Sequence, residues 1–261
     1  MSYSRAANDL AGGLRAWRLW SRLAWHDIRG RYRRSVLGPF WLTLTMAAVA
    51  VSLGLLYSRV FGREIAQYLP YICAGLIVWD TVARLLDEGC RVFLGSAHLI
   101  QSMRLDYSVL LYRLLLDVAI VFLHQIVVLV AVLAWFGQPP TAATLLALPA
   151  LALVLANGLW AALLLGLLCT RFRDVENIVR SVTRLAVFLT PVFWYVEDVG
   201  RDSGWVAWNP FYYLLELLRQ PLLGRAPDPA LWVAAAGAAA VGGGLAFLAF
   251  AHMRRRVVYW L

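Results

Sequence analysis

Long apolar runs alternate with short polar segments along the chain, and the polar segments are rich in arginine. An α-helix needs about 20 mostly apolar residues to cross the hydrocarbon of a bilayer, which is about 30 Å thick. Because six runs approach or exceed this length, we predict an all-α membrane protein with six transmembrane helices. The runs cover approximately residues 36–61, 68–86, 108–136, 144–170, 178–195 and 230–252.

The fifth run differs from the others because Pro191 interrupts it near its end. Proline lacks the backbone N–H that a helix interior requires. An aromatic-rich piece, residues 205–223, follows after a polar stretch. This pattern predicts a span that stops short and continues as a re-entrant or surface hairpin rather than as one clean helix.

The composition agrees with a membrane protein, since 62% of the 261 residues are hydrophobic. All 24 basic residues are arginine, and without lysine the chain cannot build a phosphate loop of the Walker type. If the protein does energy-driven work, we therefore expect a partner to supply the energy. We expect the widely spaced Cys73, Cys90 and Cys169 to pack as small core residues rather than to hold a metal.

The distribution of arginine predicts the orientation, because arginine-rich loops stay in the cytoplasm. Eight arginines lie in residues 1–36, three in 84–107, four in 171–184 and three in 254–256. The loops that alternate with these segments hold few arginines. Both termini are therefore expected on the cytoplasmic side.

Residues 14–33 have the pattern of an amphipathic helix that lies in the headgroup layer, with a tryptophan-rich apolar face. Two interpretations are open: its arginines anchor the N-terminus, or some of them bind a phosphate-bearing substrate through bidentate hydrogen bonds. Gly38 and Pro39 would end this helix and bend the chain into the first span. The polar face carries Arg15, Arg18, Arg22, His26, Arg29 and Arg33.

Two pairs of opposite charges lie within the predicted spans. Asp80 and Arg84 are four residues apart, as are Arg113 and Asp117. At this spacing two side chains share a helix face, so we expect each pair to neutralise itself. His124 is expected to be a hydrogen-bonded packing residue.

Aromatic residues make up 13% of the chain, and several lie within the spans or at their outer edges. Aromatic rings suit the C–H faces of sugars, whereas the alternative is an interfacial belt or ordinary packing. The residues in question are Trp41, Tyr57, Trp79, Phe188, Phe193, Trp194 and Tyr195.

Four segments in order carry a family resemblance. They read DIRGRYRRSVLGPFW (27–41), RFRDVENIV (171–179), LTPVFWYVEDV (189–199) and WNPFYYLLELLRQPLLG (208–224). Together they resemble the permease subunit of type-2 ABC exporters for bacterial polysaccharides, namely the O-antigen, capsule and teichoic-acid exporters. The resemblance runs from about Trp20 to the C-terminus.

This resemblance implies a homodimeric channel in the bacterial inner membrane, served by two copies of a cytoplasmic ABC ATPase subunit. The channel would move a lipid-linked polysaccharide, such as O-antigen on undecaprenyl diphosphate. Residues 1–35 would carry a cytoplasmic gate helix. Residues 36–261 would form the six-span domain, with a coupling helix at about 90–106 and re-entrant outer-leaflet helices at about 190–224. The chain would be a transport subunit rather than an enzyme and would hold no cofactor, with ATP and Mg bound by the partner subunit. The coupling segment departs from the family pattern, because Gln101-Ser102 and Asp106-Tyr107 replace basic residues and a Phe-Pro pair.

The resemblance also implies three groups of site residues. The gate that receives the substrate diphosphate would comprise Arg29, Arg31, Arg33, Arg34, Leu37 and Gly38. The channel aromatics would be Trp41, Tyr57, Phe188, Phe193, Trp194 and Tyr195. Coupling to the ATPase would involve Ser96, His98, Leu99, Ile100, Gln101 and Met103.

Two other functions were weighed against this one. A type-2 ABC permease for a small lipid or drug is the alternative within the superfamily, but such relatives often carry a large extracytoplasmic domain or a fused ATPase. A membrane enzyme acting on lipid phosphates would need a convergent group of His, Asp and Arg. The four histidines are scattered in sequence: His26, His98, His124 and His252.

Overall fold

The computed structural model describes residues 2–33, 38 and 40–261, and all regular structure among them is helical. Five helical segments are long and apolar enough to cross a membrane. Arg34, Leu37 and Pro39, which the predicted gate and bend include, lie outside the described residues. The five segments are α3 (Phe40–Val60), α4 (Ile65–Arg91), α6 (Ser108–Trp135), η2 (Ala142–Leu146) with α7 (Ala147–Arg171), and α10 (Pro229–Met253) with the turns that follow it.

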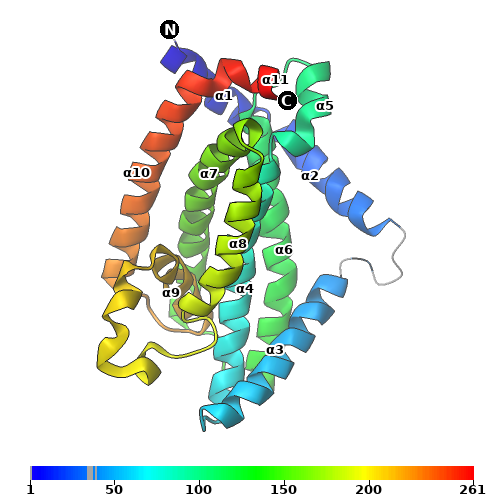
Figure 1. Ribbon diagram of the computed structural model, residues 1–261. Coiled ribbons are helices and arrows are strands. Elements are labelled where there is room, and N and C mark those ends of the chain that lie inside the picture. Colours follow the sequence, from blue (N-terminus) through cyan, green and yellow to red (C-terminus); the bar gives the residue numbers. More distant parts are fainter. Residues whose placement is uncertain (1, 34–37, 39) are drawn as a thin grey trace.

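Both chain termini lie at one end of the helix bundle, which we call the terminal end (Figure 1). Three short helices gather there: α1 (Ser2–Arg15), α5 (Ala97–Ser102) and α11 (Val257–Trp260). At the opposite, distal end lie η3 (Val196–Trp208) and α9 (Pro210–Leu222). The termini therefore share one side of the bundle, as the arginine distribution predicts.

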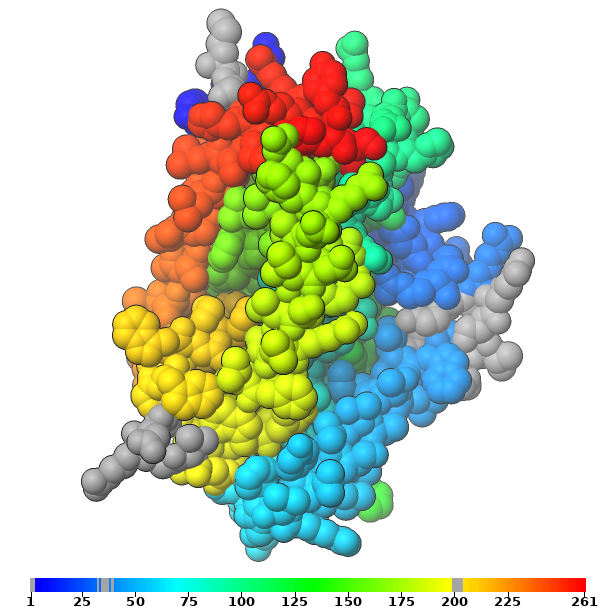
Figure 2. Space-filling view, in the orientation of Figure 1, coloured from blue at the N-terminus to red at the C-terminus, as the bar shows by residue number. Residues whose placement is uncertain are grey.

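The predicted fifth span is a short helix, α8 (Asp174–Leu189). It begins four residues earlier than expected, directly after the turn that ends α7, and it stops before Pro191. With 16 residues it is shorter than the five candidate spans, so the sixth crossing is not confirmed. Figure 2 shows α8 lying across one face of the molecule with its side chains projecting outward. Its exposed apolar residues are Ile178, Val182, Leu185, Phe188 and Leu189.

The N-terminal segment forms two helices where the sequence pattern predicts one. α1 precedes the amphipathic helix α2 (Trp17–Tyr32), and the chain bends between them at Ala16. α2 packs on α6 and buries Ala24 and Ile28. The tryptophans on its free side, Trp17 and Trp25, are exposed, as an interfacial helix requires.

The predicted bend before the first span is present at Gly38. Its φ of +54° lies in the left-handed region, which glycine adopts at little cost because it has no Cβ. The backbone N–H of Trp41 donates to the Gly38 carbonyl at 3.3 Å, so the turn leads directly into α3.

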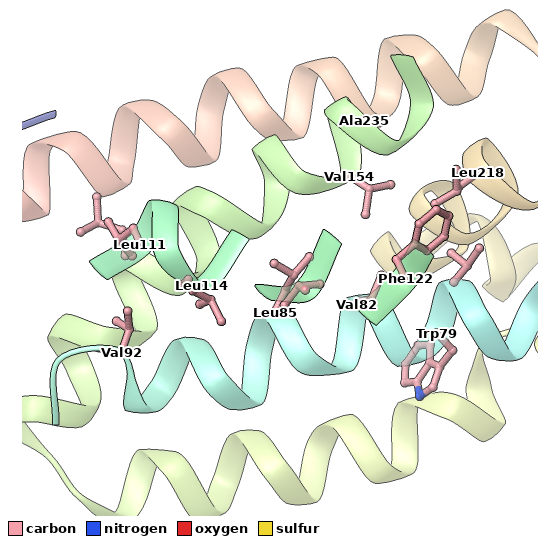
Figure 3. Packing of buried hydrophobic residues seen from close by; sticks show 14 of the residues in the cluster. Trp79, Val82, Leu85, Val92, Leu111, Leu114, Phe122, Val154, Leu218 and Ala235 are labelled. Carbon is pink, nitrogen blue, oxygen red and sulfur yellow. The ribbon is translucent and has the colours of Figure 1, made fainter. Parts of the chain in front are cut away.

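α4 is the central helix of the bundle and contacts α3, α6, α7, α8 and α9. Of the most apolar part of α4, 78% is buried, whereas the corresponding value for α3 is 11%. Because lipid tails are as apolar as leucine, close packing rather than exclusion of water holds such helices together. Figure 3 shows these core side chains, among them Trp79, Val82, Leu85, Leu111, Phe122, Val154, Leu218 and Ala235. The cysteines Cys73, Cys90 and Cys169 are also buried and unbridged, as expected.

α4 and α7 approach each other closely because glycines line their contact. A Cβ added at Gly89 would lie 2.8 Å from the Cα of Ala162, and one at Gly158 would lie 2.5 Å from Cδ1 of Leu85. Both distances are well below the optimal separation of carbon atoms, about 3.5–4.0 Å. A larger side chain at either position would push the two helices apart.

Pro70 lies inside α4, where its missing N–H frees the carbonyl of Ala66. Gln138, in the turn after α6, donates from Nε2 to this carbonyl at 2.8 Å. The substitute hydrogen bond matters because an unpaired carbonyl within a membrane is costly. It also ties the beginning of α4 to the end of α6.

Candidate functional site

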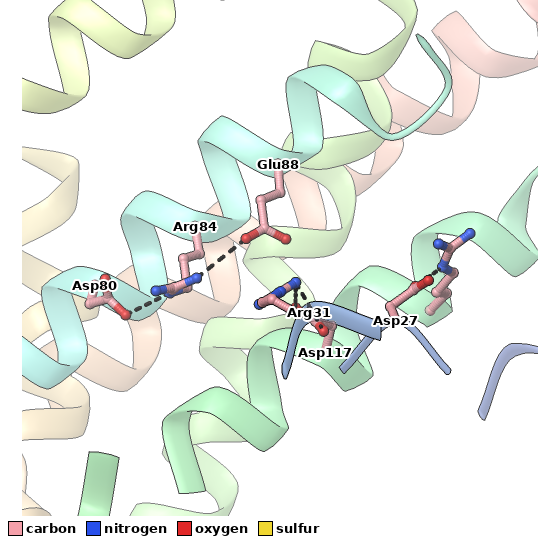
Figure 4. Close-up of polar contacts among 7 residues, drawn as sticks. Asp27, Arg31, Asp80, Arg84, Glu88 and Asp117 are labelled. Atoms are coloured by element: carbon pink, nitrogen blue, oxygen red, sulfur yellow. Dashed lines mark hydrogen bonds and ion pairs between the residues drawn. The ribbon is translucent and has the colours of Figure 1, made fainter. Parts of the chain in front are cut away.

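Two ion pairs fasten the last turns of α2 to α6 (Figure 4). Arg113 Nε donates to Asp27 Oδ2, and Arg31 Nη2 donates to Asp117 Oδ2 at 3.2 Å. The prediction that Arg113 and Asp117 neutralise one another is therefore wrong, because each binds a residue of α2. Both helices carry an acid and a base four residues apart, so their charges match across the contact.

The Arg31–Asp117 pair is the more sensitive of the two to loss of one partner. Asp117 is only 4% exposed, whereas the side chain of Arg31 is 39% exposed. Removing the arginine would leave a buried carboxylate without its cation, which typically costs about 3–5 kcal/mol. Arg31 thus has a structural task in holding α2 on α6.

Arg84 joins two carboxylates on α4 beside these pairs (Figure 4). The predicted Asp80–Arg84 pair is confirmed, with Arg84 Nε 2.7 Å from Asp80 Oδ2, and Arg84 Nη1 also donates to Glu88 at 3.4 Å. Gln125 of α6 donates to the same Asp80 oxygen at 2.7 Å. We call the groups on α2, α4 and α6 the charged junction. A cavity of about 260 Å³ opens there, lined among others by Asp27, Arg31, Glu88, Arg91, Arg113 and Asp117.

The predicted gate arginines differ in what they contact. Arg31 is engaged by Asp117, as described above. Arg29 and Arg33 are exposed, and neither forms an ion pair within the part of the chain that the structure describes. Arg29 lies over the ring of Trp25, with its guanidinium carbon 5.8 Å from the ring centroid. These two side chains are therefore the members of the described gate with guanidinium groups available to an external anion.

The predicted coupling segment contains the turn η1 (Leu94–Ser96) and the short helix α5, both at the terminal end. His98, Gln101 and Met103 are exposed there, while Ser96 and Leu99 are partly buried. Ile100 is buried in the core cluster, so its side chain is not part of the surface. Contact with another protein would have to use the exposed members of the group.

Four of the six predicted channel aromatics belong to one chain of ring contacts near the distal end. Tyr57 stacks on Phe193 with ring centroids 6.1 Å apart, and Phe193 packs on Phe188 at 6.0 Å. The fourth member is Tyr195, which the chain reaches through rings that the sequence reasoning missed. The connecting rings are Phe61, Tyr68 and Tyr71.

The other predicted aromatics lie elsewhere. Trp194 packs on Trp205 at 5.7 Å, and Trp79 packs edge-on against Phe211 at 5.7 Å in the core. Trp41 is exposed at the start of α3 and has no ring contact among the described residues. These three rings therefore do not extend the chain at the distal end.

Three side chains hold the broken segment 190–195 that follows α8. The hydroxyls of Tyr68 and Tyr71 donate to carbonyls in this segment, with a distance of 2.9 Å for Tyr71. Arg219 Nη1 donates to the Pro191 carbonyl at 2.7 Å. Backbone that leaves the helical conformation at membrane depth needs such partners from the protein itself. The interruption that Pro191 predicts is thus built into a fixed structure.

Arg219 is the buried cation of the distal end, with 1% of its surface exposed. It pairs with Glu216 one turn earlier in α9, and its guanidinium carbon lies 3.9 Å from the ring centroid of Tyr71. Arg219 is not among the site residues predicted from the sequence. The spacing of three residues from Glu216, within an apolar stretch, was the signal that could have identified the pair.

Asp9 of α1 caps the beginning of α6, a role that the sequence reasoning also missed. Its carboxylate accepts hydrogen bonds from the backbone N–H groups of Tyr107, at 3.2 Å, and Ser108, at 3.0 Å. Arg254 donates to the same carboxylate at 2.7 Å. Asp106 lies beside this group, and burial together with the negative charge of Asp9 raises the pKa of its carboxyl group, although Arg254 opposes the shift.

Most of the residues described above lie in a part of the chain that is similar to known proteins. Residues 18–223 match the family described as ABC-2 type transporter. Two proteins named O-antigen export system permease protein RfbA from Klebsiella pneumoniae are each 23% identical over 188 residues, which is 70% of this chain and 72% of theirs. A protein of the same name from Myxococcus xanthus is 24% identical over 196 residues, or 74% of this chain and 75% of its own. The family match begins in α2 and ends just after α9.

Proposed function

Because the chain belongs to the ABC-2 type transporter family, we propose that it is the channel-forming permease subunit of an ATP-driven exporter of lipid-linked polysaccharide. The substrate would be a polymer such as O-antigen on undecaprenyl diphosphate, carried across the bacterial inner membrane. The names of the three relatives support the choice of polysaccharide within the family. A small lipid or drug remains the alternative substrate class.

The observation that carries this proposal is the way in which α2 is held. Its two ion pairs to α6 fix the helix, and Arg29 and Arg33 remain exposed on it. Guanidinium groups bind phosphate oxygens through paired hydrogen bonds. In our proposal these two arginines receive the diphosphate of the lipid carrier, while Arg31 keeps the helix in place.

The terminal end would face the cytoplasm and meet two copies of an ABC ATPase subunit. α5 supports this proposal because it projects at that end with His98, Gln101 and Met103 exposed. ATP-driven closure of the partner would act on the permease through this helix. The short helix α8 would then complete six crossings, followed by re-entrant η3 and α9 on the outer side.

A second copy of the chain would close the channel. α3 is largely unburied within one chain, and α8 exposes an apolar row along one face. A homodimer that brings these helices together would place Tyr57, Phe188 and Phe193 along the path of the polymer. Aromatic rings there would offer stacking surfaces to sugars.

Export in cells lacking the native permease tests this proposal. We expect the double variant Arg29→Gln, Arg33→Gln to lose surface polysaccharide while its membrane abundance and ATPase co-purification stay normal. The matched control, Arg255→Gln with Arg256→Gln, removes the same charge from exposed positions at the same end and should export normally. Unchanged surface polysaccharide in the α2 variant would refute the assignment of the diphosphate to these arginines.

A further inference from the structure

Two adjoining cavities with both polar and apolar linings lie at the distal end, away from the charged junction. Their volumes are about 730 Å³ and 290 Å³, and the larger lies within the range of small-molecule sites, about 300–1,000 Å³. Segments far apart in the sequence build them, from the start of α4 to the end of α9. Both cavities are lined by Tyr71, Tyr195, Glu197, Leu223 and Arg225.

The wall between the cavities is a stack of four side chains. Tyr71 and Tyr195 lie face to face with ring centroids 3.8 Å apart and an interplanar angle of 18°. The guanidinium carbon of Arg219 lies 3.9 Å from the Tyr71 centroid, and that of Arg63 lies 4.2 Å from the Tyr195 centroid. Each outer face of the tyrosine pair is thus covered by a cation, which favours a rigid wall. A rigid wall lowers the entropic cost of binding a ligand.

Polar side chains line both cavities, and two of them make no hydrogen bond or ion pair with another described residue. The side chains of Glu197 and Arg225 are exposed, and neither makes a hydrogen bond or ion pair with another described residue. Gln220 lines the larger cavity and Gln67 the smaller. A carboxylate accepts hydrogen bonds, a guanidinium donates them and an amide does both. The cavities therefore offer both kinds of partner within one site.

Among the residues whose side chains the structure describes, the charges around this wall cancel one another. Arg63, Arg219 and Arg225 supply three positive groups, and Glu197, Asp198 and Glu216 supply three negative groups. An anionic ligand would be favoured by an excess of positive charge, and an apolar ligand by an apolar lining. Balanced charges with mixed donors and acceptors instead suit a neutral ligand that carries many hydroxyl groups.

We propose that the distal cavities bind neutral sugar units of an oligosaccharide. Neighbouring hydroxyls of a hexose can donate to Glu197 while accepting from Arg225, and the larger cavity has room for more than one polar contact. The biological source of the sugar rests on the proposed function, since an exported polymer would meet this site as it emerges. Binding of a free oligosaccharide does not depend on export.

Saturation-transfer NMR on the purified chain in nanodiscs tests this proposal. The probes are maltotetraose, cellotetraose and mannotetraose, with tetragalacturonate as an acidic counterpart. We expect saturation transfer to at least one neutral tetrasaccharide, with binding weakened about tenfold in the double variant Glu197→Ala, Arg225→Ala. This variant keeps the net charge and removes two exposed groups without protein partners, so it should fold normally.

The matched control is Arg173→Ala with Asp174→Ala, an exposed basic and acidic pair at the terminal end. It should bind as the unaltered chain does. The proposal is overturned if no neutral tetrasaccharide binds, if the double variant binds as well as the control, or if tetragalacturonate binds best and is displaced by salt. If the unaltered chain binds no oligosaccharide but the α2 variant shows the expected export defect, the cavity proposal alone is rejected. If the α2 variant exports normally while the unaltered chain binds oligosaccharide, the diphosphate gate alone is rejected.

Discussion

Arg254 Nε lies 2.7 Å from Asp9 Oδ2, and this contact joins the last part of the chain to its first helix. The same carboxylate accepts two backbone N–H groups at the start of α6. A helix start offers unpaired N–H groups and a partial positive charge, so a buried carboxylate from a distant segment can serve as its cap. One side chain thereby connects α1, α6 and the turn after α10.

Replacing Asp9 with alanine should destabilise the purified chain strongly. The change leaves two buried N–H groups and Arg254 without their acceptor, at a cost of about 3–5 kcal/mol. Thermal unfolding in detergent measures this effect. Asp228→Ala is the control, because Asp228 caps α10 through one exposed hydrogen bond of 2.8 Å and its loss should cost only about 1 kcal/mol. Equal shifts in the two variants would contradict the role given to Asp9.

Asp106→Asn should change the pH dependence of stability at the terminal end. Burial and the charge of Asp9 raise the pKa of the Asp106 carboxyl group above its unfolded value, so folding favours the protonated form. This contribution is present below the unfolded pKa, about 3.9, and is lost as pH rises through the higher folded pKa. Unfolding midpoints measured from about pH 4 to pH 7 should therefore fall less in the variant. An identical pH slope in both proteins would show that Asp106 does not contribute.

The pairing of Arg31 with Asp117 should appear as coupling in a double-mutant cycle. Arg31→Ala alone leaves a buried carboxylate and should cost about 3–5 kcal/mol, whereas adding Asp117→Ala should recover much of that loss. Arg29→Ala is the matched control, because this arginine of the same helix has no carboxylate partner in the described chain, and its effect should be within about 0.5 kcal/mol. Additive losses in the double variant would exclude a direct pair.

Substitutions of exposed residues in and beside α5 should weaken binding of the ATPase, whereas substitution of a buried residue should lower the stability of the chain. The triple variant His98→Ala, Gln101→Ala, Met103→Ala should reduce co-purification of the ATPase several-fold without changing the stability of the chain. Ile100→Ala should instead lower stability by about 2–4 kcal/mol, because its side chain is buried. Ser102→Ala, exposed on the same helix, is the control. Normal ATPase recovery with the triple variant would remove α5 from the proposed contact.

Hydropathy located the long helices, because each apolar run must be long enough to span the hydrocarbon. The predicted and observed bounds of the third run agree within one residue, 108–136 against Ser108–Trp135. Pro191 likewise marked the end of α8, since a proline disfavours the helical conformation of the residue before it. Hydropathy did not predict where α8 begins. The residues of its first turns are helical, but several are polar and therefore lie outside the apolar run.

Contacts between side chains of different helices were harder to predict than the positions of the helices in the sequence. The spacing of Arg113 and Asp117 suggested a pair within α6, but Asp27 and Arg31 have the same spacing on α2, and the sequence does not say that the two helices meet. The helix pattern recognised in residues 14–33 did not include α1, so the contact of Asp9 with the start of α6 could not be predicted. The spacing of charged residues therefore shows which ion pairs a helix could form within itself, whereas tertiary packing decides which pairs form.

The close contact of α4 with α7 limits how this molecule can move. Gly89 against Ala162 and Gly158 against Leu85 leave no clearance for one helix to slide or rotate along the other. We therefore expect the two helices to move as one unit. α3, by contrast, is mostly unburied and is entered through the bend at Gly38.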